Sequence, residues 1–119
     1  MAQRQLVYMG RSQRDLTAFP EDVQDVVTLA LLEAVDGYKH QDATPMRGFG
    51  GASVLEIRQS FHTDEYRVVY TTRFPEAICV LHAFKKKFRQ GIATAKRDVD
   101  LIRQRLKTAA ELYAKGELP

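Results

Sequence analysis

The sequence predicts an α+β fold in a single domain spanning residues 1–119, with two helices, a small and mostly antiparallel sheet, and a long closing helix. Apolar residues recur at helical spacing before residue 37 and after residue 94. Between residues 54 and 84 they instead alternate or run together in three segments, and only short breaks separate these, which favours antiparallel hairpins. With 45% hydrophobic residues, a chain of 119 residues can bury a core of its own.

The first third of the chain is predicted to form a short strand and two helices. Residues 5–9 form the strand. Residues 12–15, Ser-Gln-Arg-Asp, have the spacing of a capping box, so we expect the Ser12 side chain to cap a short helix. Pro20 suits the first turn of a second helix, which ends at Gly37 because glycine tolerates left-handed backbone geometry.

The rest of the chain is predicted to form three strands and a helix. Residues 54–59 and 66–71 alternate apolar and polar side chains. Residues 77–84 are apolar on both faces, which predicts that this last strand is central in its sheet. Thr94 can cap a long helix that ends at Gly116.

The charge is unevenly distributed along the chain. The net charge is +3, but residues 1–46 carry four basic and seven acidic side chains, and residues 47–119 carry fourteen basic and eight acidic ones. This asymmetry suggests a face that binds a polyanion. The longest apolar runs have four and five residues, far below the ~20 of a membrane helix, and the single Cys79 excludes an internal disulfide framework. We therefore expect a cytoplasmic protein without a membrane segment.

The strongest local signal is a basic segment that follows the last predicted strand. It contains six basic residues and no acidic one: Lys85, Lys86, Lys87, Arg89, Lys96 and Arg97. A solvated charged loop is the alternative interpretation. In a globular context, the segment instead indicates a phosphate-binding surface.

Three strand residues could carry chemistry. Glu56 and Arg67 each lie mid-strand between apolar neighbours, and a simple cross-strand ion pair, worth ~0.2–1 kcal/mol, is the alternative to a catalytic role. His82 interrupts the most apolar strand and can exchange a proton near neutral pH, although a hydrogen-bonded core histidine is the commoner case. Cys79 is interpreted as a small buried apolar residue, and strand alternation predicts that it faces away from His82.

No cofactor or metal site is predicted. The glycine-rich residues 48–51 follow no strand and precede no Lys-Ser or Lys-Thr pair, so they fit a tight turn and not a nucleotide-binding loop. The three histidines, His40, His62 and His82, lie in unlike settings without the spacing of metal ligands.

Several segments together resemble a known family. They are PMRGFGG at 45–51, VLEI at 54–57, YRVVY at 66–70, VLHAFKKK at 80–87, GIAT at 91–94 and IRQRL at 102–106. In this order they resemble the HigB-like, phage-derived branch of the RelE/ParE toxin superfamily, over nearly the whole chain. The resemblance implies a RelE/ParE-like fold and the toxin of a type II toxin–antitoxin pair.

The resemblance also implies a reaction. Such toxins typically cleave messenger RNA at the ribosome without a metal, by attack of the ribose 2′-OH on the adjacent phosphorus. This needs a base, a cation that stabilises the phosphorane, and an acid. The resemblance assigns these roles to Glu56, Arg67 and His82 respectively, with Lys86 as an alternative proton donor.

RNA contacts and partners follow from the same resemblance. The residues expected to bind RNA are Arg47, Lys85, Lys87, Arg89, Lys96 and Arg97. The expected partners are messenger RNA, the ribosome and a HigA-like helix-turn-helix antitoxin, whose complex with the toxin binds operator DNA. Two other functions stay open: a ParE-like toxin that poisons DNA gyrase, and a basic nucleic-acid-binding protein without catalytic activity.

Overall fold

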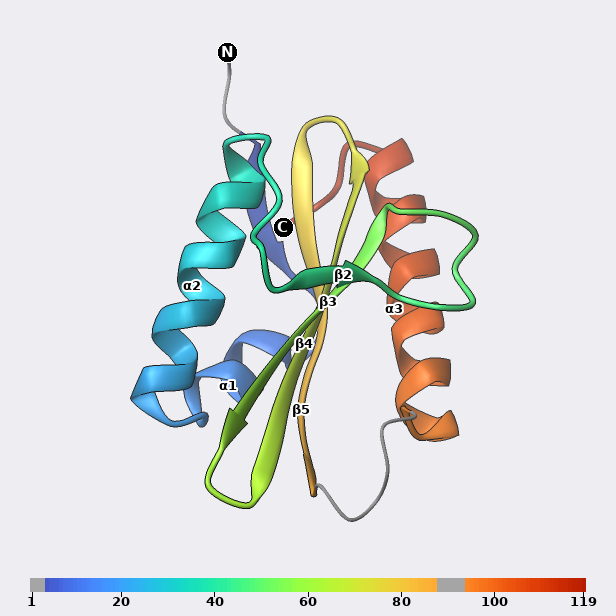
Figure 1. Ribbon diagram of the computed structural model, residues 1–119. Helices are drawn as coiled ribbons and strands as arrows, with labels where there is room; N and C mark the ends of the chain where they lie inside the picture. The colour runs from blue at the N-terminus through green and yellow to red at the C-terminus, as the bar shows by residue number, and fades with distance from the viewer. Residues whose placement is uncertain (1–3, 88–93) are drawn as a thin grey trace.

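The computed structural model describes residues 4–87 and 94–119 of the chain. Its elements are β1 (Gln5–Tyr8), α1 (Ser12–Thr17), α2 (Glu21–Val35), β2 (Ala43–Pro45), β3 (Val54–Phe61), β4 (Asp64–Phe74), β5 (Ala77–Lys87) and α3 (Lys96–Ala114). The sheet lies between two helical layers, with α1 and α2 on one side and α3 on the other (Figure 1). The predicted α+β fold is confirmed.

The five strands form one sheet in the order β1-β5-β4-β3-β2. The β2–β3, β3–β4 and β4–β5 pairs are antiparallel, and β1 pairs parallel with β5. β5 therefore lies in the interior, as its two apolar faces predict, although the middle position belongs to β4. The short strand β2 is not predicted from the sequence.

Each face of the sheet buries its own apolar layer. The α1/α2 face packs side chains of both helices on β3, β4 and β5, and its buried members include Val27, Leu31, Leu55, Ile57, Val68, Tyr70, Ile78 and Val80. The α3 face packs Ile102, Leu106 and Ala109 on Val54, Val69, Cys79 and Leu81, among others. The two layers hold α3 and the α1–α2 pair in fixed positions on opposite sides of the strands.

The predicted caps of two helices are wrong. Arg11 and not Ser12 is the N-cap of α1, and the Ser12 hydroxyl is buried and donates to the Val80 carbonyl at 3.3 Å. Ala95 and not Thr94 is the N-cap of α3. Among the described residues, no side chain caps either helix. In each case the hydroxyl is used in a tertiary contact, which local sequence spacing does not reveal.

A β-bulge in β5 overturns the predicted facing of His82. In the ladder with β4, His82 pairs with Val69 but Val80 pairs with Tyr70, so Leu81 is an extra residue. The alternation resets there, and Cys79 and His82 both lie on the α3 face. Burial raises the pKa of the Cys79 thiol to about 11, which confirms its interpretation as a buried apolar residue.

The glycine-rich segment forms a loop between β2 and β3 that is anchored on α3. The Arg103 guanidinium lies 4.5 Å from the centre of the buried Phe49 ring, and its Nη2 donates to the Gly48 carbonyl at 2.9 Å. Gly48 has φ +89°, and a Cβ there would lie 3.1 Å from Arg103 Nη2. This contact fixes the loop that carries Arg47.

Candidate functional site

Charged side chains lie on the α3 face of β3 and β4. Leu55 and Ile57 pack against α1 and α2, while Glu56 and Arg58 alternate with them on the other side of the sheet. β4 adds Arg67, which lies opposite Arg58 in the strand register. The two strands therefore bring one carboxylate and two guanidinium groups onto the same face.

Arg67 is a buried cation whose contacts include three polar side chains. Its side chain is 1% exposed, its Nε donates to Glu65 Oε1 at 2.6 Å, and its Nη1 donates to Thr94 Oγ1 at 3.0 Å. Nη1 also lies 4.0 Å from Glu56 Oε2. The structure thus brings Glu56 and Arg67 together, diagonally and not directly across the strands.

Glu56 is the other buried charge of this cluster. Arg58 Nε donates to Glu56 Oε1 at 2.5 Å, and the Arg58 side chain is 43% exposed whereas that of Glu56 is 3% exposed. Within the described part of the chain, Glu56 Oε2 accepts no hydrogen bond. Arg58 and Arg67 repel each other across the strands, and Glu56 and Glu65 offset that repulsion. The cluster therefore combines a carboxylate oxygen with spare acceptor capacity and an arginine that reaches solvent.

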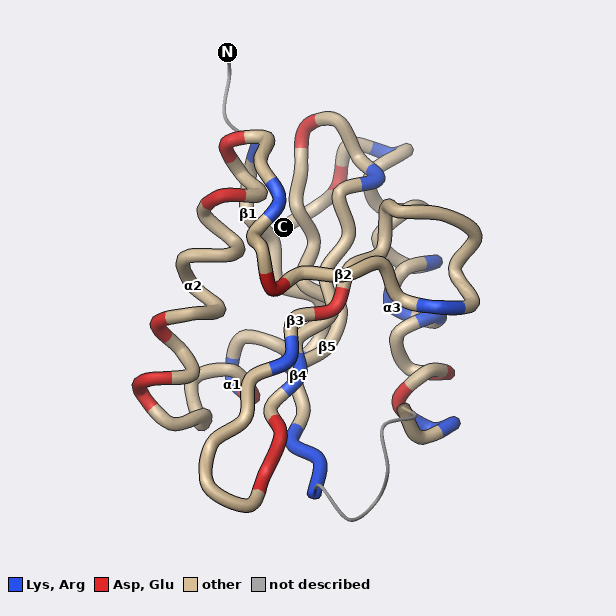
Figure 2. The backbone as a smooth tube through the Cα atoms, viewed as in Figure 1, with Lys and Arg blue, Asp and Glu red and all other residues tan. Residues whose placement is uncertain are grey.

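A groove of about 690 Å³ lies beside this cluster. Its lining residues come from β2 and the loops on either side of it, from β3, and from the segment that leads into the first turn of α3: Asp42, Thr44, Pro45, Met46, Arg47, Glu56, Arg58, Thr94 and Val99. Figure 2 shows basic positions on β3, on the loop after β2 and at the end of β5, whereas acidic positions follow α2 on the far side of the sheet. The groove is thus lined by the buried carboxylate of Glu56 and by the exposed cations of Arg47 and Arg58.

His82 links β5 to α3 and does not line the groove. Its Nε2 lies 2.8 Å from Asp98 Oδ1, and its Nδ1 lies 3.5 Å from Arg105 Nη1. Its ring stacks on Phe84 with the ring centres 4.6 Å apart, and Phe84 pairs with Arg67 in the strand register. His82 therefore shares the face of the charged cluster, with both ring nitrogens already in contact with α3.

Strand alternation separates the three consecutive lysines. β5 extends to Lys87, so Lys85 and Lys87 lie on the α1/α2 side, 3.9 and 3.2 Å from the Asp64 carboxylate. Lys86 lies on the side of the charged cluster and pairs with Glu65 in the register. The predicted single phosphate-binding surface is wrong in this respect, because the lysines are within a strand and not in a loop after it.

The other predicted RNA-binding residues lie in different places. Arg47 lines the groove, and Arg97 is exposed in the first turn of α3. Lys96 Nζ donates to Asp100 Oδ2 at 2.8 Å, and this hydrogen bond raises the pKa of Lys96. Arg89 lies outside the described residues. Of these cations, Arg47 has the most direct access to the groove.

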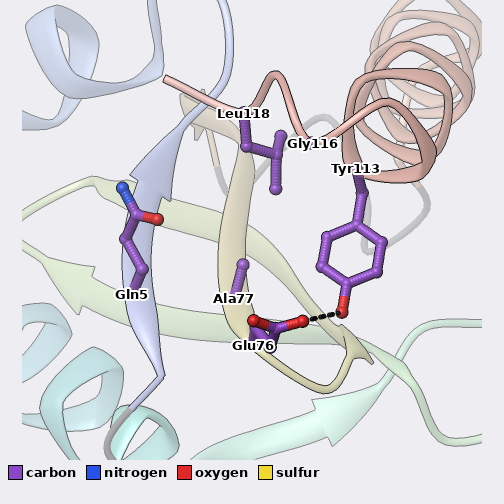
Figure 3. A pocket seen from close by; sticks show the side chains of 6 residues that line it. All are labelled: Gln5, Glu76, Ala77, Tyr113, Gly116 and Leu118. Atoms are coloured by element: carbon purple, nitrogen blue, oxygen red, sulfur yellow. Dashed lines mark hydrogen bonds between the residues drawn. The ribbon is translucent and has the colours of Figure 1, made fainter.

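A second, smaller cavity of about 250 Å³ lies at the far end of the sheet (Figure 3). It is lined by Gln5, Glu76, Ala77, Tyr113, Gly116 and Leu118. Tyr113 Oη donates to Glu76 Oε1 at 3.2 Å across it. Because its described lining contains no cation, this cavity does not suit a phosphate.

Sequence reasoning missed two of the groove's charged residues, Asp42 and Arg58. Arg58 follows Glu56 by two positions, and this strand spacing was a signal that both share a face. Asp42 precedes the unpredicted strand β2, so the sequence offered no element on which to place it. Thr94 was noted, but as a helix cap and not as a partner of Arg67.

The described residues contain neither a metal-ligand cluster nor a membrane-spanning helix. Residues 4–87 and 94–119 contain no group of three or more His, Cys, Asp or Glu side chains that could hold a metal ion. In the same part of the chain, no helix combines the length and the apolar character needed to cross a membrane.

Comparison with known proteins places the chain in a family. The family model described as phage-derived protein Gp49-like matches residues 14–107. The chain belongs to this family. The match agrees with the phage-derived origin of the family that the sequence resembles. A comparison with curated proteins gave no match.

Solved structures with a similar fold include two of a bacterial toxin. A double mutant of the Escherichia coli toxin RelE in the free state superposes with a TM-score of 0.60 at 18% identity, covering 88% of this chain and 98% of that one. The isolated E. coli RelE toxin gives a TM-score of 0.53 at 14% identity, covering 85% and 97%. The Gp49-like chain therefore has the fold of RelE.

Proposed function

We propose that this Gp49-like protein is the toxin of a toxin–antitoxin pair, and that it arrests growth by cutting messenger RNA in the groove beside Glu56 and Arg58. Its family and its RelE-like fold support the toxin role. The observation that carries the ribonuclease role is the pairing of a buried carboxylate, which keeps an oxygen without a hydrogen bond, with an arginine exposed in the same groove.

The proposed reaction is an internal transfer at phosphorus. The ribose 2′-oxygen bonds to the adjacent phosphorus and the bond from phosphorus to the 5′-oxygen breaks. This leaves a 2′,3′-cyclic phosphate and a 5′-hydroxyl. Glu56 Oε2 takes the 2′ proton, for which a carboxylate with a spare acceptor oxygen is suited. A second group must give a proton to the leaving 5′-oxygen.

Two arginines supply the positive charge that the phosphorane requires. Arg58 reaches the groove, so we assign it the first contact with the phosphate oxygens. Direct contact by Arg67, as predicted from the sequence, requires Glu65 to release its Nε, because the Arg67 side chain is 1% exposed. In the resting site Arg67 positions Glu56 and Thr94.

His82 and Lys86 are the proposed proton donors. An imidazole can donate a proton, but donation by His82 to the 5′-oxygen requires its contact with Asp98 to open. Lys86 lies on the face of Arg67, near the end of β5. Arg47 and Arg97 are proposed to hold the RNA backbone near the groove, while Lys85 and Lys87 would contact a separate part of the RNA. Lys96 joins Arg97 in this role, and Arg89 stays a prediction.

The proposed partners follow from the toxin role. They are ribosome-bound messenger RNA and a HigA-like helix-turn-helix antitoxin that neutralises the basic residues and binds operator DNA together with the toxin. A clustered cationic surface attracts such a partner and speeds its association at low salt. We expect all of these encounters to occur in the cytoplasm.

Expression in growing cells, followed by pulse labelling, tests the function. We expect protein synthesis to stop first and messenger RNA to be cleaved, whereas an earlier stop of DNA synthesis would favour the gyrase-poisoning toxin. Arg58→Ala should reduce cleavage of ribosome-bound message by about 100- to 1,000-fold, the usual loss for one charge-stabilising group. The matched control is Arg14→Ala, which removes an exposed arginine on α1, away from the groove.

A second variant separates catalysis from binding. Glu56→Gln keeps the shape of the side chain and removes the proton acceptor, so cleavage should fall while RNA binding persists. A folded Glu56→Gln protein that cleaves at the wild-type rate would overturn the assigned base. Binding of nucleic acid without any cleavage by the wild-type protein would favour the non-catalytic function.

A further inference from the structure

We propose that Asp42 forms a base-binding subsite in the groove and selects guanine next to the cleaved phosphate. The inference rests on the proposed ribonuclease function and names the feature of the RNA that the groove recognises. It starts from the presence of a carboxylate at the solvent-accessible mouth of a groove that otherwise attracts phosphates.

The strand register places Asp42 beside the charged cluster. In β2, Ala43 pairs with Ile57 and Thr44 pairs with Glu56 of β3. Asp42 lies directly before β2, next to the Ala43–Ile57 pair, so it is close to Arg58 of β3. Both residues line the groove. A nucleotide whose phosphate contacts Arg58 can therefore bring its base, or that of its neighbour, to Asp42.

The backbone around Asp42 is held by a network centred on His40. The buried His40 ring accepts a hydrogen bond from the Asp42 N–H at 3.0 Å through Nδ1, which places the proton of the neutral ring on Nε2. The His40 carbonyl accepts from the Ala43 N–H at 3.0 Å, and Lys39 Nζ donates to the Ala43 carbonyl at 2.7 Å. Asp42 is thus presented from a fixed turn, as base recognition requires.

The Asp42 carboxylate keeps capacity for a ligand. Its side chain is 45% exposed, and the contacts found for it are a 3.3 Å hydrogen bond from Gln59 Nε2 to Oδ2 and a 3.9 Å approach of His40 Nδ1 to the same oxygen. These long contacts fix the orientation of Oδ2 weakly. The two oxygens can therefore turn together toward a pair of donors.

Guanine is the base that supplies such a pair. Its Watson–Crick edge carries two adjacent donors, N1–H and the N2 amino group, which match the two oxygens of a carboxylate. Adenine and cytosine place a donor next to an acceptor, and uracil has one donor between two acceptors. A carboxylate in this groove repels the RNA backbone, and guanine is the base that offsets this repulsion best.

The remaining groove lining suits a flat base. Pro45, Met46 and Val99 provide apolar surface beside Asp42 and Thr44. At about 690 Å³, the groove falls within the roughly 300–1,000 Å³ of small-molecule sites, so it can hold a base together with its phosphate.

Mapping of cleavage positions on ribosome-bound messages with randomised codons tests the inference. The wild-type protein should cut preferentially beside guanine. Asp42→Asn presents one acceptor and one donor, so guanine preference should fall by roughly 5- to 150-fold, the discrimination of one bidentate base contact, while cleavage beside adenine or cytosine persists. Asp42→Ala should abolish the preference without creating a new one. The control is Asp25→Asn, an equal charge change at an exposed position on α2.

The outcomes separate the two proposals. A wild-type protein that cleaves no RNA overturns the proposed function and the guanine subsite with it. Cleavage by the wild-type protein with a base preference that Asp42→Asn and Asp42→Ala leave unchanged overturns the subsite alone. An equal loss at all four bases in variants with wild-type thermal melting would also overturn it, since Asp42 would then act in the reaction.

Discussion

On the α1/α2 face of β3 and β4, the side chains of Leu55, Ile57 and Val68 are buried in an apolar layer. On the α3 face of the same strands, Glu56 and Arg67 are equally buried, and both are charged. The residues alternate along one backbone, so the two faces share strand geometry and differ in chemistry. Both faces are therefore equally buried, but only one of them is apolar.

The difference follows from how far α3 covers its face. Its buried apolar residues, Ile102, Leu106 and Ala109, begin after the first turn and a half of the helix. The first turn of α3, with Val99, and the preceding Thr94 instead border the groove. Since buried ion pairs add little net stability compared with apolar packing, the charges of the α3 face suggest a function beyond packing.

Removal of Arg67 should give the largest change in stability. Arg67→Ala leaves Glu56 and Glu65 without their buried cation, so we expect the free energy of unfolding to fall by about 3–5 kcal/mol. Urea denaturation measures this loss. Arg67→Lys keeps a charge and should retain more stability, but it should not restore full cleavage, because an ammonium lacks the planar fork of donors.

The corresponding double variant sharpens the comparison. Glu56→Leu combined with Arg67→Met makes the α3 face resemble the α1/α2 face, and it should be more stable than Arg67→Ala while remaining inactive in RNA cleavage. A double variant that folds and still cleaves would show that these charges serve packing and not the reaction.

An apolar truncation on the other face should affect stability alone. Ile57→Ala lies between Glu56 and Arg58 in sequence but opens a cavity against α1 and α2, so it should cost about 2–5 kcal/mol. Cleavage by the folded fraction should remain close to that of the wild-type protein. A selective loss of activity at full folding, measured by circular dichroism beside the cleavage assay, would argue that the two faces are coupled.

Alkaline pH should destabilise the α1/α2 face through Tyr70. Burial, and then the nearby Glu33 charge, raise the pKa of Tyr70 from 10 to about 12. Between pH 10 and pH 12 the unfolded chain releases a proton from Tyr70 that the folded chain retains. The free energy of unfolding should therefore fall by about 1.4 kcal/mol per pH unit in this range. Below pH 10 this tyrosine should have no effect on the free energy of unfolding.

Tyr70→Phe isolates this effect. The Tyr70 hydroxyl is buried and has no hydrogen-bond partner among the described residues, so its removal should leave the stability at pH 7 unchanged or slightly higher. The difference between the two unfolding free energies should grow from pH 10 to 12. Parallel pH profiles for the two proteins would contradict the assignment of that titration to Tyr70.

The contrast between the two faces also explains which parts of the fold could be predicted from the sequence. Periodicity was enough for the helices and the three long strands, because alternation between apolar and polar residues reflects the faces directly. It could not reveal the bulge at Leu81, which turns His82 to the α3 face, because a one-residue insertion leaves no local pattern. It also could not show that Ser12 and Thr94 bond to residues distant in sequence.

The candidate site was predicted in part for similar reasons. Glu56 and Arg67 were recognisable as charges within apolar strands, and the structure brings them to one face. The role of Arg67 in direct phosphate contact stays a prediction, since its burial depends on Glu65 and Thr94, which no local pattern connects to it. The prediction that Lys85, Lys86 and Lys87 form one surface is wrong because β5 continues through them and alternation places them on two faces.

The smallest expected effects come from these three lysines, and they divide along the two faces of β5. Single alanine substitutions should each change the free energy of unfolding by at most about 1 kcal/mol, because the ion pairs of Lys85 and Lys87 with Asp64 are exposed on the lysine side and solvent screens them. Cleavage should respond differently to the three substitutions. Lys86→Ala removes a cation from the face of Arg67 and should slow the reaction. Lys85→Ala and Lys87→Ala should weaken RNA binding and reduce its salt dependence, with little change in the rate at saturating RNA. The three variants carry the same charge change at neighbouring positions, so each serves as a control for the others. Equal effects of all three on the saturated rate would mean that the lysines act through total charge, and that the face on which each side chain lies has no influence on the reaction.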